Sequence, residues 1–212
     1  MDKLIIIGAG GFGRETAWLV ERINKVKSTW EIVGFLDDVK ERGQIINSYP
    51  VLGKIEDAAK YPNAYFACAI GNAKARRRII ENLTVRCPNI RFAILIDPTV
   101  EISPWTDVGE GSIICAQTII TVNAKIGRHV IVNLDCTIGH DAVLEDYVTL
   151  YPSVNVSGMT KIGKATELGT GTQIIQGRTI APGSVIGAGA VVIRDMENSC
   201  TAVGVPAKWV HD

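Results

Sequence analysis

The stretch TIGHDAVLEDYVTLYPSVNVSGMTKIG, residues 137–163, carries an aliphatic residue at every sixth position. The same period runs without a skipped position from Ile96 to Val192, and all seventeen positions are Ile, Val or Leu. These three types make up 59 of the 212 residues, so chance produces such a run on the order of once in a billion trials. An unbroken period of six predicts a coil of hexapeptide repeats and is not expected of a β-sandwich.

A second position repeats four residues after each aliphatic, where the residue is usually small or β-branched. One large and one small inward residue per hexad fit a three-sided coil of between five and six turns, stacked on a continuous core. Arg178 is the exception to the small positions, and the inward Cys136 is expected in the core. We expect tight bends at the glycines that directly follow an aliphatic: Gly109, Gly127, Gly139, Gly163, Gly169 and Gly187.

The first ninety residues follow a different pattern, in which short apolar runs alternate with amphipathic segments. Residues 3–23 predict a buried strand, a glycine turn and a helix. Further strands are expected within residues 31–38, 64–72 and 90–96, and a helix over residues 73–86. We therefore predict an α/β Rossmann-like domain at residues 1–95 and an all-β coil at residues 96–212, whose out-of-phase tail, from Met196, closes the open end.

The composition limits the classes of partner and the cellular compartment that we expect for this protein. Lys plus Arg and Asp plus Glu are both 22, which leaves no electrostatic footprint for a nucleic acid or an anionic membrane. The five cysteines form no C-x-x-C pair and are odd in number, which indicates reduced thiols and neither a disulfide scaffold nor a metal site. The apolar opening is too short for a membrane span and lacks the features of a signal peptide. We expect a cytoplasmic protein with a small-molecule or protein partner.

The glycine turn satisfies G-x-G-x-x-G through Gly8, Gly10 and Gly13, directly after a strand and at the start of a helix. In this context backbone amides at a helix N-terminus bind phosphate. Asp37 and Asp38 end the second strand, where an acidic residue meets a ribose or a base. Fewer than 100 residues leave no room for a full dinucleotide fold with a hydride-acceptor site, which argues against NAD. The alternative is that the glycines serve only strand-to-helix packing.

Six motifs carry a resemblance that covers almost the whole chain: GAGGFGRE (8–15), FLDD (35–38), AIGN (69–72), IGHD (138–141), GAGAVV (187–192) and VGVPAK (203–208). Together with the hexads, they resemble the bacterial nucleotide-sugar acetyltransferases. That family includes the UDP-4-amino-sugar N-acetyltransferase of bacillosamine synthesis, perosamine N-acetyltransferases and sialic acid O-acetyltransferases. The resemblance implies a left-handed parallel β-helix, a homotrimer, acetyl-coenzyme A in the groove between neighbouring helices, and a nucleotide-sugar in the N-terminal domain.

The resemblance also implies binding residues. The nucleotide-sugar is expected to contact Gly10, Gly11, Phe12, Asp37, Asp38 and Gly71. Acetyl-coenzyme A is expected to contact Thr149, Thr170 and Ala188. Thr149 stands where some relatives have a second histidine, nine residues after the catalytic base, and its hydroxyl could donate to the thioester carbonyl. For Thr170 and Ala188 the alternative is that tight corners require small residues.

His140 is the candidate general base, because a neutral imidazole can take the proton of an attacking amine or hydroxyl. It follows Gly139 near a corner where a side chain points out of the coil. Asp141 can accept a hydrogen bond from the imidazole and stabilise the imidazolium. The alternative is a solvated pair of turn residues. His129 and His211 are both expected on the surface.

These features predict an acetyl-coenzyme A-dependent N-acetyltransferase acting directly on the 4-amine of a nucleotide-linked deoxysugar for a surface glycan. UDP is the expected nucleotide, with GDP and CMP left open. One alternative is O-acetylation of sialic acid or another sugar. A second alternative, from a different class, is a non-catalytic trimer that binds a nucleotide-sugar.

Overall fold

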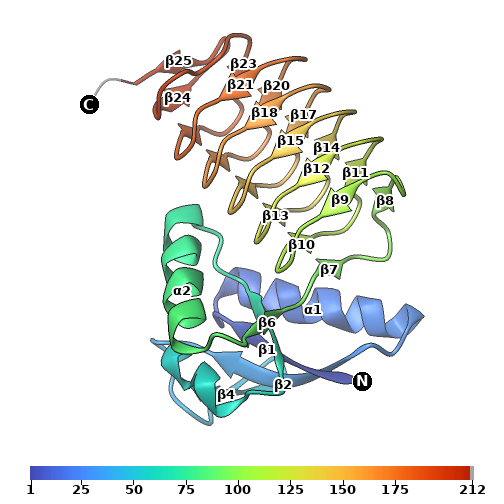
Figure 1. Ribbon diagram of the computed structural model, residues 1–212, viewed down its shortest axis with the longest axis vertical. Coiled ribbons are helices and arrows are strands. Elements are labelled where there is room, and N and C mark those ends of the chain that lie inside the picture. The colour runs from blue at the N-terminus through green and yellow to red at the C-terminus, as the bar shows by residue number, and fades with distance from the viewer. Residues whose placement is uncertain (211–212) are drawn as a thin grey trace.

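The computed structural model describes residues 1–210; His211 lies outside the described residues. The chain forms an α/β unit and a tall β-coil, joined near residue 93 (Figure 1). Among the described residues no helix is both long and apolar enough to cross a bilayer.

The α/β unit is built on a mainly parallel sheet of strand order β3-β4-β2-β1-β5-β6. Its central strands are buried and apolar, as expected where helices cover both faces. The short β3 pairs antiparallel with β4, and this pair was not expected from the sequence. The strands are β1 (Asp2–Ile7), β2 (Trp30–Leu36), β3 (Ile45–Ile46), β4 (Tyr49–Gly53), β5 (Tyr65–Cys68) and β6 (Arg91–Phe92), and the helices are α1 (Gly11–Val26), the 3₁₀ helix η1 (Ile55–Lys60) and α2 (Ala73–Arg86).

Residues 90–96, expected to form one strand, are divided between the two units. β6 pairs with β5 in the α/β sheet, whereas β7 (Leu95–Ile96) pairs with β10 of the coil. The single-strand prediction was wrong because the chain leaves one sheet and enters the next between these two short strands. The expected domain boundary at 95/96 falls within β7.

The coil has three faces of short strands, and from Leu95 to Val192 each strand has two residues and pairs in parallel with the strand eighteen residues away. The first face contains β7, β10 (Ile113–Ile114), β13 (Ile131–Val132), β16 (Thr149–Leu150), β19 (Glu167–Leu168), β22 (Val185–Ile186), β24 (Thr201–Val203) and β25 (Lys208–Trp209). The second face contains β8 (Glu101–Ile102), β11 (Ile119–Ile120), β14 (Thr137–Ile138), β17 (Asn155–Val156), β20 (Gln173–Ile174) and β23 (Val191–Val192). The third face contains β9 (Asp107–Val108), β12 (Lys125–Ile126), β15 (Val143–Leu144), β18 (Lys161–Ile162) and β21 (Thr179–Ile180).

Inside the coil, the aliphatic and small positions of the repeat pack into one cluster, and Cys136 lies in it as expected. The open end is closed by β24, which pairs with β22, and by Met196, which bridges to Ile180. The repeat prediction is therefore confirmed in its period, its three faces and its cap.

The glycines that follow the aliphatic positions have a different cause from the one expected. A Cβ on Gly139 would lie 2.5 Å from the nitrogen of Gly158 in the next coil, so space and not a bend excludes a side chain. The left-handed backbone falls two residues later, for example at Asp141 with φ of 58°. The bend prediction was wrong because, at these glycines, atoms of the next coil lie too close to leave room for a Cβ.

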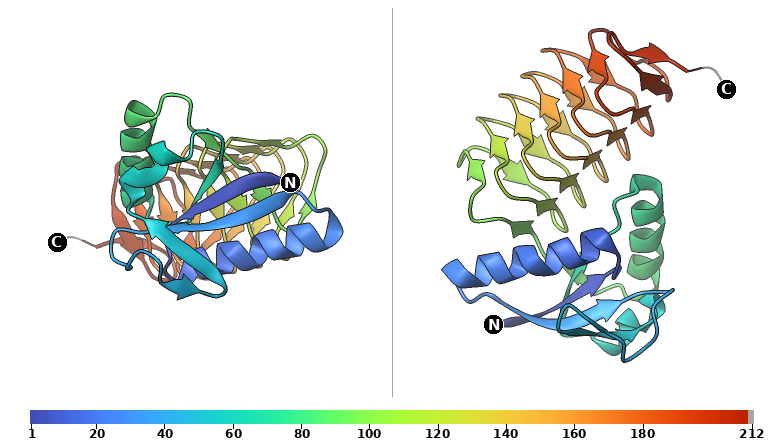
Figure 2. Two further views of the ribbon diagram at one scale, coloured as in Figure 1. Left: turned by 90° about the horizontal axis from the view of Figure 1, so that it is seen from below. Right: turned by 180° about the vertical axis from the view of Figure 1, so that it is seen from behind.

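The α/β unit covers part of the first face. α1 lies beneath the lowest coils, where Leu19 and Val20 pack with the outward side chains of Leu95, Ile113 and Ile131. α2 stands alongside the coils (Figures 1 and 2). These contacts fix the α/β unit against the coil.

Candidate active site

His140 and Asp141 lie at the corner between the second and third faces, after β14 and before β15. His140 Nδ1 is 2.8 Å from Asp141 Oδ2, and the two side chains are 48% and 50% exposed. The left-handed conformation of Asp141, whose N–H donates to the Val122 carbonyl, directs both side chains outward. The structure thus brings the predicted base and its partner together.

The hydrogen bond between His140 and Asp141 leaves the imidazole in the form that a general base needs. An ionised carboxylate can only accept, so Nδ1 donates to Asp141 and Nε2 keeps its free lone pair. Hydrogen bonds from His140 and from the Asn123 amide lower the pKa of Asp141. The carboxylate therefore stays ionised wherever the imidazole can act as a base.

Gly158 forms the floor beneath the imidazole. A Cβ at this position would lie 2.5 Å from His140 Nε2 and 2.7 Å from two ring carbons. Sequence reasoning missed both Gly158 and Asn123. Each lies eighteen residues, or one coil, from a member of the pair, so the eighteen-residue coil repeat is the signal that could have found them.

Thr170 and Ala188 lie at another corner, between the first and second faces. Both are exposed, and they continue a row with Leu134 and Pro152 at intervals of eighteen residues. A six-residue face spans up to about 20 Å at about 3.3 Å per residue. A single chain therefore holds the predicted cofactor residues and His140 at opposite edges of the second face.

Thr149 is buried on β16 beneath the α/β unit. Its hydroxyl donates to the Gly71 carbonyl at 2.8 Å and accepts from Arg76 Nη2 at 2.9 Å. The hydroxyl hydrogen is thus already used, and Thr149 lies beside the predicted sugar-binding loop and away from the row of Thr170 and Ala188. In this structure it has no hydrogen left to donate to the thioester carbonyl.

The four glycines of the glycine-rich turn have two different roles. Gly8 has φ of 94°, and a Cβ on Gly13 would lie 2.0 Å from the Gly8 carbonyl oxygen, so these two glycines serve packing. A Cβ on Gly10 or Gly11 would meet no atom of the described chain within 4 Å, so these two glycines leave the start of α1 open. Within residues 1–210 no side chain caps this end, and the first turn of α1 holds no acidic residue. The amides of the first turn, including that of Phe12, can therefore receive an anion.

The two aspartates after β2 have different surroundings. Asp37 accepts bonds from the backbone nitrogens of Ala9, Val39 and Lys40. Burial acts to raise the pKa of Asp37, but these bonds outweigh it and lower the pKa. Asp37 therefore links the turn between β1 and α1 to the loop that follows β2.

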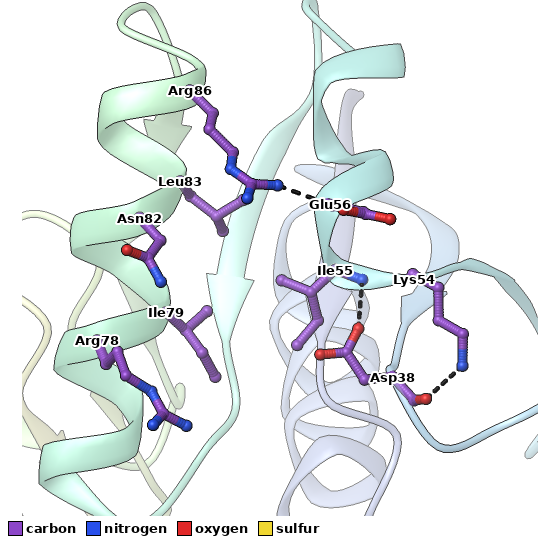
Figure 3. Close-up of a pocket in the computed structure, with 9 residues that line it drawn as sticks. All are labelled: Asp38, Lys54, Ile55, Glu56, Arg78, Ile79, Asn82, Leu83 and Arg86. Atoms are coloured by element: carbon purple, nitrogen blue, oxygen red, sulfur yellow. Dashed lines mark hydrogen bonds and ion pairs between the residues drawn. The ribbon is translucent and has the colours of Figure 1, made fainter.

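Asp38 accepts from the Ile55 nitrogen at 3.0 Å and lines a cavity of about 530 Å³ between η1 and α2 (Figure 3). An ion pair between Arg86 and Glu56 closes one end of the cavity. Figure 3 shows Arg78 and Asn82 facing it from α2. Carboxylate, amide and guanidinium groups together can form hydrogen bonds with the edge of a nucleotide base.

Gly71 lies in the loop from β5 to α2, against the coil. The buried Glu167 accepts from the Asn72 side chain at 2.8 Å, the Ala73 nitrogen at 2.9 Å and the Tyr151 hydroxyl at 3.1 Å. Arg76 is 1% exposed and donates to both units. Sequence reasoning missed Glu167 and Arg76, because neither position differs from a surface charge until the α/β unit covers it.

His129, expected on the surface, is buried with 5% of its area exposed, and that expectation was wrong. Its ring packs edge-on against Phe92 and stacks on Tyr147, because the α/β unit covers this corner. Burial lowers the pKa of His129 to about 4, and Nδ1 has no hydrogen-bond partner among residues 1–210. His129 is a neutral packing residue, which leaves His140 as the exposed imidazole of the described chain.

Comparison with known proteins identifies the family. Residues 3–83 match the PglD N-terminal domain. The chain is 32% identical over 165 residues to the GDP-perosamine N-acetyltransferase of Escherichia coli O157:H7, which covers 76% of this chain and 73% of that protein. The chain belongs to the PglD-type acetyltransferase family.

Solved structures agree with this assignment along the whole chain. The acetyltransferase domain of PglB from Neisseria gonorrhoeae FA1090 superposes on this PglD-type protein with a TM-score of 0.91 at 32% identity, covering 99% of this chain and 100% of that one. A His-to-Asn variant of perosamine N-acetyltransferase from Caulobacter crescentus, in complex with coenzyme A and GDP-perosamine, gives a TM-score of 0.89 at 26% identity, covering 100% and 98%. The expected fold class, an α/β domain followed by a left-handed β-helix, is confirmed.

Within residues 1–210, no group of three His, Cys, Asp or Glu side chains could hold a metal ion.

Proposed function

We propose that this PglD-type protein is an acetyl-coenzyme A-dependent N-acetyltransferase that acts on the amine of a nucleotide-linked 4-amino-deoxysugar for a surface glycan. The observation that carries the proposal is the exposed His140–Asp141 pair, whose Nε2 is free, in a chain of this family. The PglB domain has also been solved with acetyl coenzyme A, at 33% identity to this chain.

In the proposed reaction the sugar amine attacks the thioester carbonyl as His140 Nε2 takes the proton from its nitrogen. The tetrahedral intermediate then collapses, the carbon–sulfur bond breaks, and the thiolate of coenzyme A accepts the proton from the imidazolium. Asp141 stabilises that imidazolium. Cys136 does not suit an acyl-enzyme step, because it is fully buried and burial raises its pKa to about 11. Direct transfer is the route that these side chains favour.

The active site is proposed to lie between the chains of a homotrimer. His140 and the row of Thr170 and Ala188 occupy opposite edges of the second face, so a neighbouring chain is needed to bring them together. The second face and its edges expose Ile119, Val122, Leu134, Met159 and Ile175, each between 38% and 52% exposed. Apolar side chains gathered in this way favour an interface between copies of the chain.

The α/β unit is proposed to hold the nucleotide-sugar. The open amides of Gly10, Gly11 and Phe12 suit the diphosphate, and Asp38 with its cavity suits the base. The family resemblance implies UDP, whereas one relative is named a GDP-perosamine N-acetyltransferase and a solved relative is in complex with GDP-perosamine. A direct comparison of the two nucleotides therefore belongs in the first assay.

The test is release of free thiol from acetyl-coenzyme A with UDP-, GDP- and CMP-linked amino sugars and with free sialic acid. We expect turnover with an amino sugar, and a loss of ~10²-fold or more in His140→Ala and His140→Asn. Light scattering checks that each variant keeps its oligomeric state. Undiminished turnover in folded His140→Ala would overturn the mechanism, and use of sialic acid alone would replace N-acetylation by O-acetylation.

Mixed trimers test the location of the site. His140→Ala and Thr170→Trp would each be inactive alone, because one lacks the base and the other blocks the cofactor corner. If the site is shared between chains, co-expression of the two variants restores part of the activity, since some interfaces combine the intact corners. Absence of any recovery in verified mixed trimers would contradict a shared site.

A further inference from the structure

Arg76 is the largest of the fully buried side chains, and it bonds to no carboxylate in the described chain. Its guanidinium makes six hydrogen bonds, five of them to backbone carbonyls. Nε donates to His129, Nη1 to Ile70 and Gly71, and Nη2 to Tyr147, Val148 and the Thr149 hydroxyl. Burial lowers the pKa of Arg76 to about 10, so the side chain remains charged at neutral pH.

These bonds join the sugar-binding loop to two stacked coils. Ile70 and Gly71 follow β5 in the α/β unit, whereas His129 and Tyr147 occupy equivalent corner positions eighteen residues apart in the coil. The Gly71 carbonyl accepts from both Arg76 Nη1, at 2.9 Å, and Thr149 Oγ1, at 2.8 Å. The loop is therefore held against the coil by its carbonyl groups, in addition to the bonds that Asn72 and Ala73 donate to Glu167.

The direction of those carbonyls fixes the direction of the neighbouring amides. In a trans peptide the C=O and the following N–H point to opposite sides. Since the carbonyls of Ile70 and Gly71 turn inward to Arg76, the N–H groups of Gly71 and Asn72 turn away from it. Neither N–H has a hydrogen-bond partner among residues 1–210.

These two amides lie at the same edge of the sheet as the open start of α1. β5 and β1 are adjacent and parallel, so the loop at residues 70–72 and the turn at Gly10 and Gly11 both follow carboxyl ends of neighbouring strands. A diphosphate held by the α1 amides would lie beside the amides of Gly71 and Asn72.

We propose that Arg76 is a positioning residue for the nucleotide-sugar. By holding the carbonyls of the Gly71 loop against the coil, it keeps the amides of Gly71 and Asn72 directed at the nucleotide site. This inference rests on the proposed function, since it assumes that the α/β unit binds a nucleotide-sugar. A purely structural role would require Arg76 only as a link between the two units.

The chain offers a matched control for that structural role. Arg22 of α1 also links the two units, through Asp97 at the first corner of the coil, but it does not contact the Gly71 loop. Arg22→Met therefore removes an arginine contact between the units and leaves the loop carbonyls bound.

The experiment compares the wild type, Arg76→Met, Arg76→Lys and Arg22→Met by calorimetric titration with UDP and with GDP, and by steady-state kinetics. We expect Arg76→Met to raise the Kd of the nucleotide that the wild type binds, and the KM of its sugar conjugate, by about tenfold. The KM of acetyl-coenzyme A and kcat should change less than about twofold, and Arg76→Lys should restore part of the nucleotide affinity. Arg22→Met should lower the melting temperature and leave the Kd within about twofold.

Unchanged nucleotide affinity in folded Arg76→Met, or an equal loss in Arg22→Met, would overturn the proposal. If Arg76→Met does not fold, Thr149→Val removes one of the two bonds to the Gly71 carbonyl. A rise in nucleotide Kd of about threefold would support the proposal, whereas a selective rise in the KM of acetyl-coenzyme A would contradict it. A wild-type protein that binds neither nucleotide and acetylates no nucleotide-sugar would instead refute the proposed function.

Discussion

Gly158→Ala tests whether the exact placement of the His140 ring matters. The added Cβ would lie 2.5 Å from Nε2, whereas ordinary contacts begin at 3.4 Å. The ring must therefore move by about 1 Å and would strain its bond to Asp141, and a misplacement of this size can cost ~10²-fold in rate. We expect kcat to fall between about tenfold and 10²-fold.

The fold itself should tolerate the change. Gly158 has no left-handed φ, and the equivalent positions in the neighbouring coils hold Val122, His140 and Gln176. The melting temperature should therefore stay close to that of the wild type. This separates displacement of the ring from loss of stability.

Steady-state kinetics with the preferred amino sugar provide the assay, with the neighbouring exposed residue in Ser157→Ala as the matched control. The double variant His140→Ala/Gly158→Ala should be no slower than His140→Ala, because the Cβ then has no ring to displace. A kcat within twofold of the wild type in Gly158→Ala would refute the reasoning, as would an additive loss in the double variant.

Three further predictions concern the corner at His140 and the buried corner at His129. Asp141→Asn should lower kcat by ~10²-fold in steady-state kinetics, because the imidazolium loses its anionic partner; an unchanged kcat would contradict this role. Gly139→Ala should destabilise the coil by about 2 kcal/mol in urea unfolding, because its Cβ meets backbone atoms of the next coil, and unchanged stability would be the contrary result. The pKa of His129 is lowered from 6.5 to about 4 in the folded chain. As the pH falls below about 6.5, His129 therefore takes up a proton in the unfolded chain before it does so in the folded chain, and the free energy of unfolding decreases. That loss should reach about 2–3 kcal/mol by about pH 4.5 and should be smaller in His129→Phe; an equal loss in the variant would assign the effect to other groups.

The coil could be predicted almost completely, because its rule is local. Each hexad repeats the same choice of inward residue, so Ile138 and Cys136 were placed inside and His140 outside without knowledge of any distant contact. The start of α1 was also readable, since the strand, the glycine turn and the helix are consecutive. The two short strands β6 and β7 were not separable, because their different partners lie in different sheets.

The candidate site was predicted in part. His140 and Asp141 are adjacent in the chain, and a corner position brings them together wherever the coil forms. Asn123 and Gly158 require the coil repeat to be applied across eighteen residues. Thr149 required knowledge of the Gly71 loop, which lies 78 residues earlier in the chain.

What the sequence by itself determined is therefore the architecture of the repeat, the corner that carries His140 and Asp141, and the open glycine turn, because each depends on neighbours a few residues away. What only the tertiary structure decided is which outward positions are covered. The packing of the α/β unit against the coil buried His129, committed the Thr149 hydroxyl and enclosed Arg76, whereas the same residue types stay exposed at other corners. Burial is set by contacts between distant segments, and no local pattern in this chain encodes it.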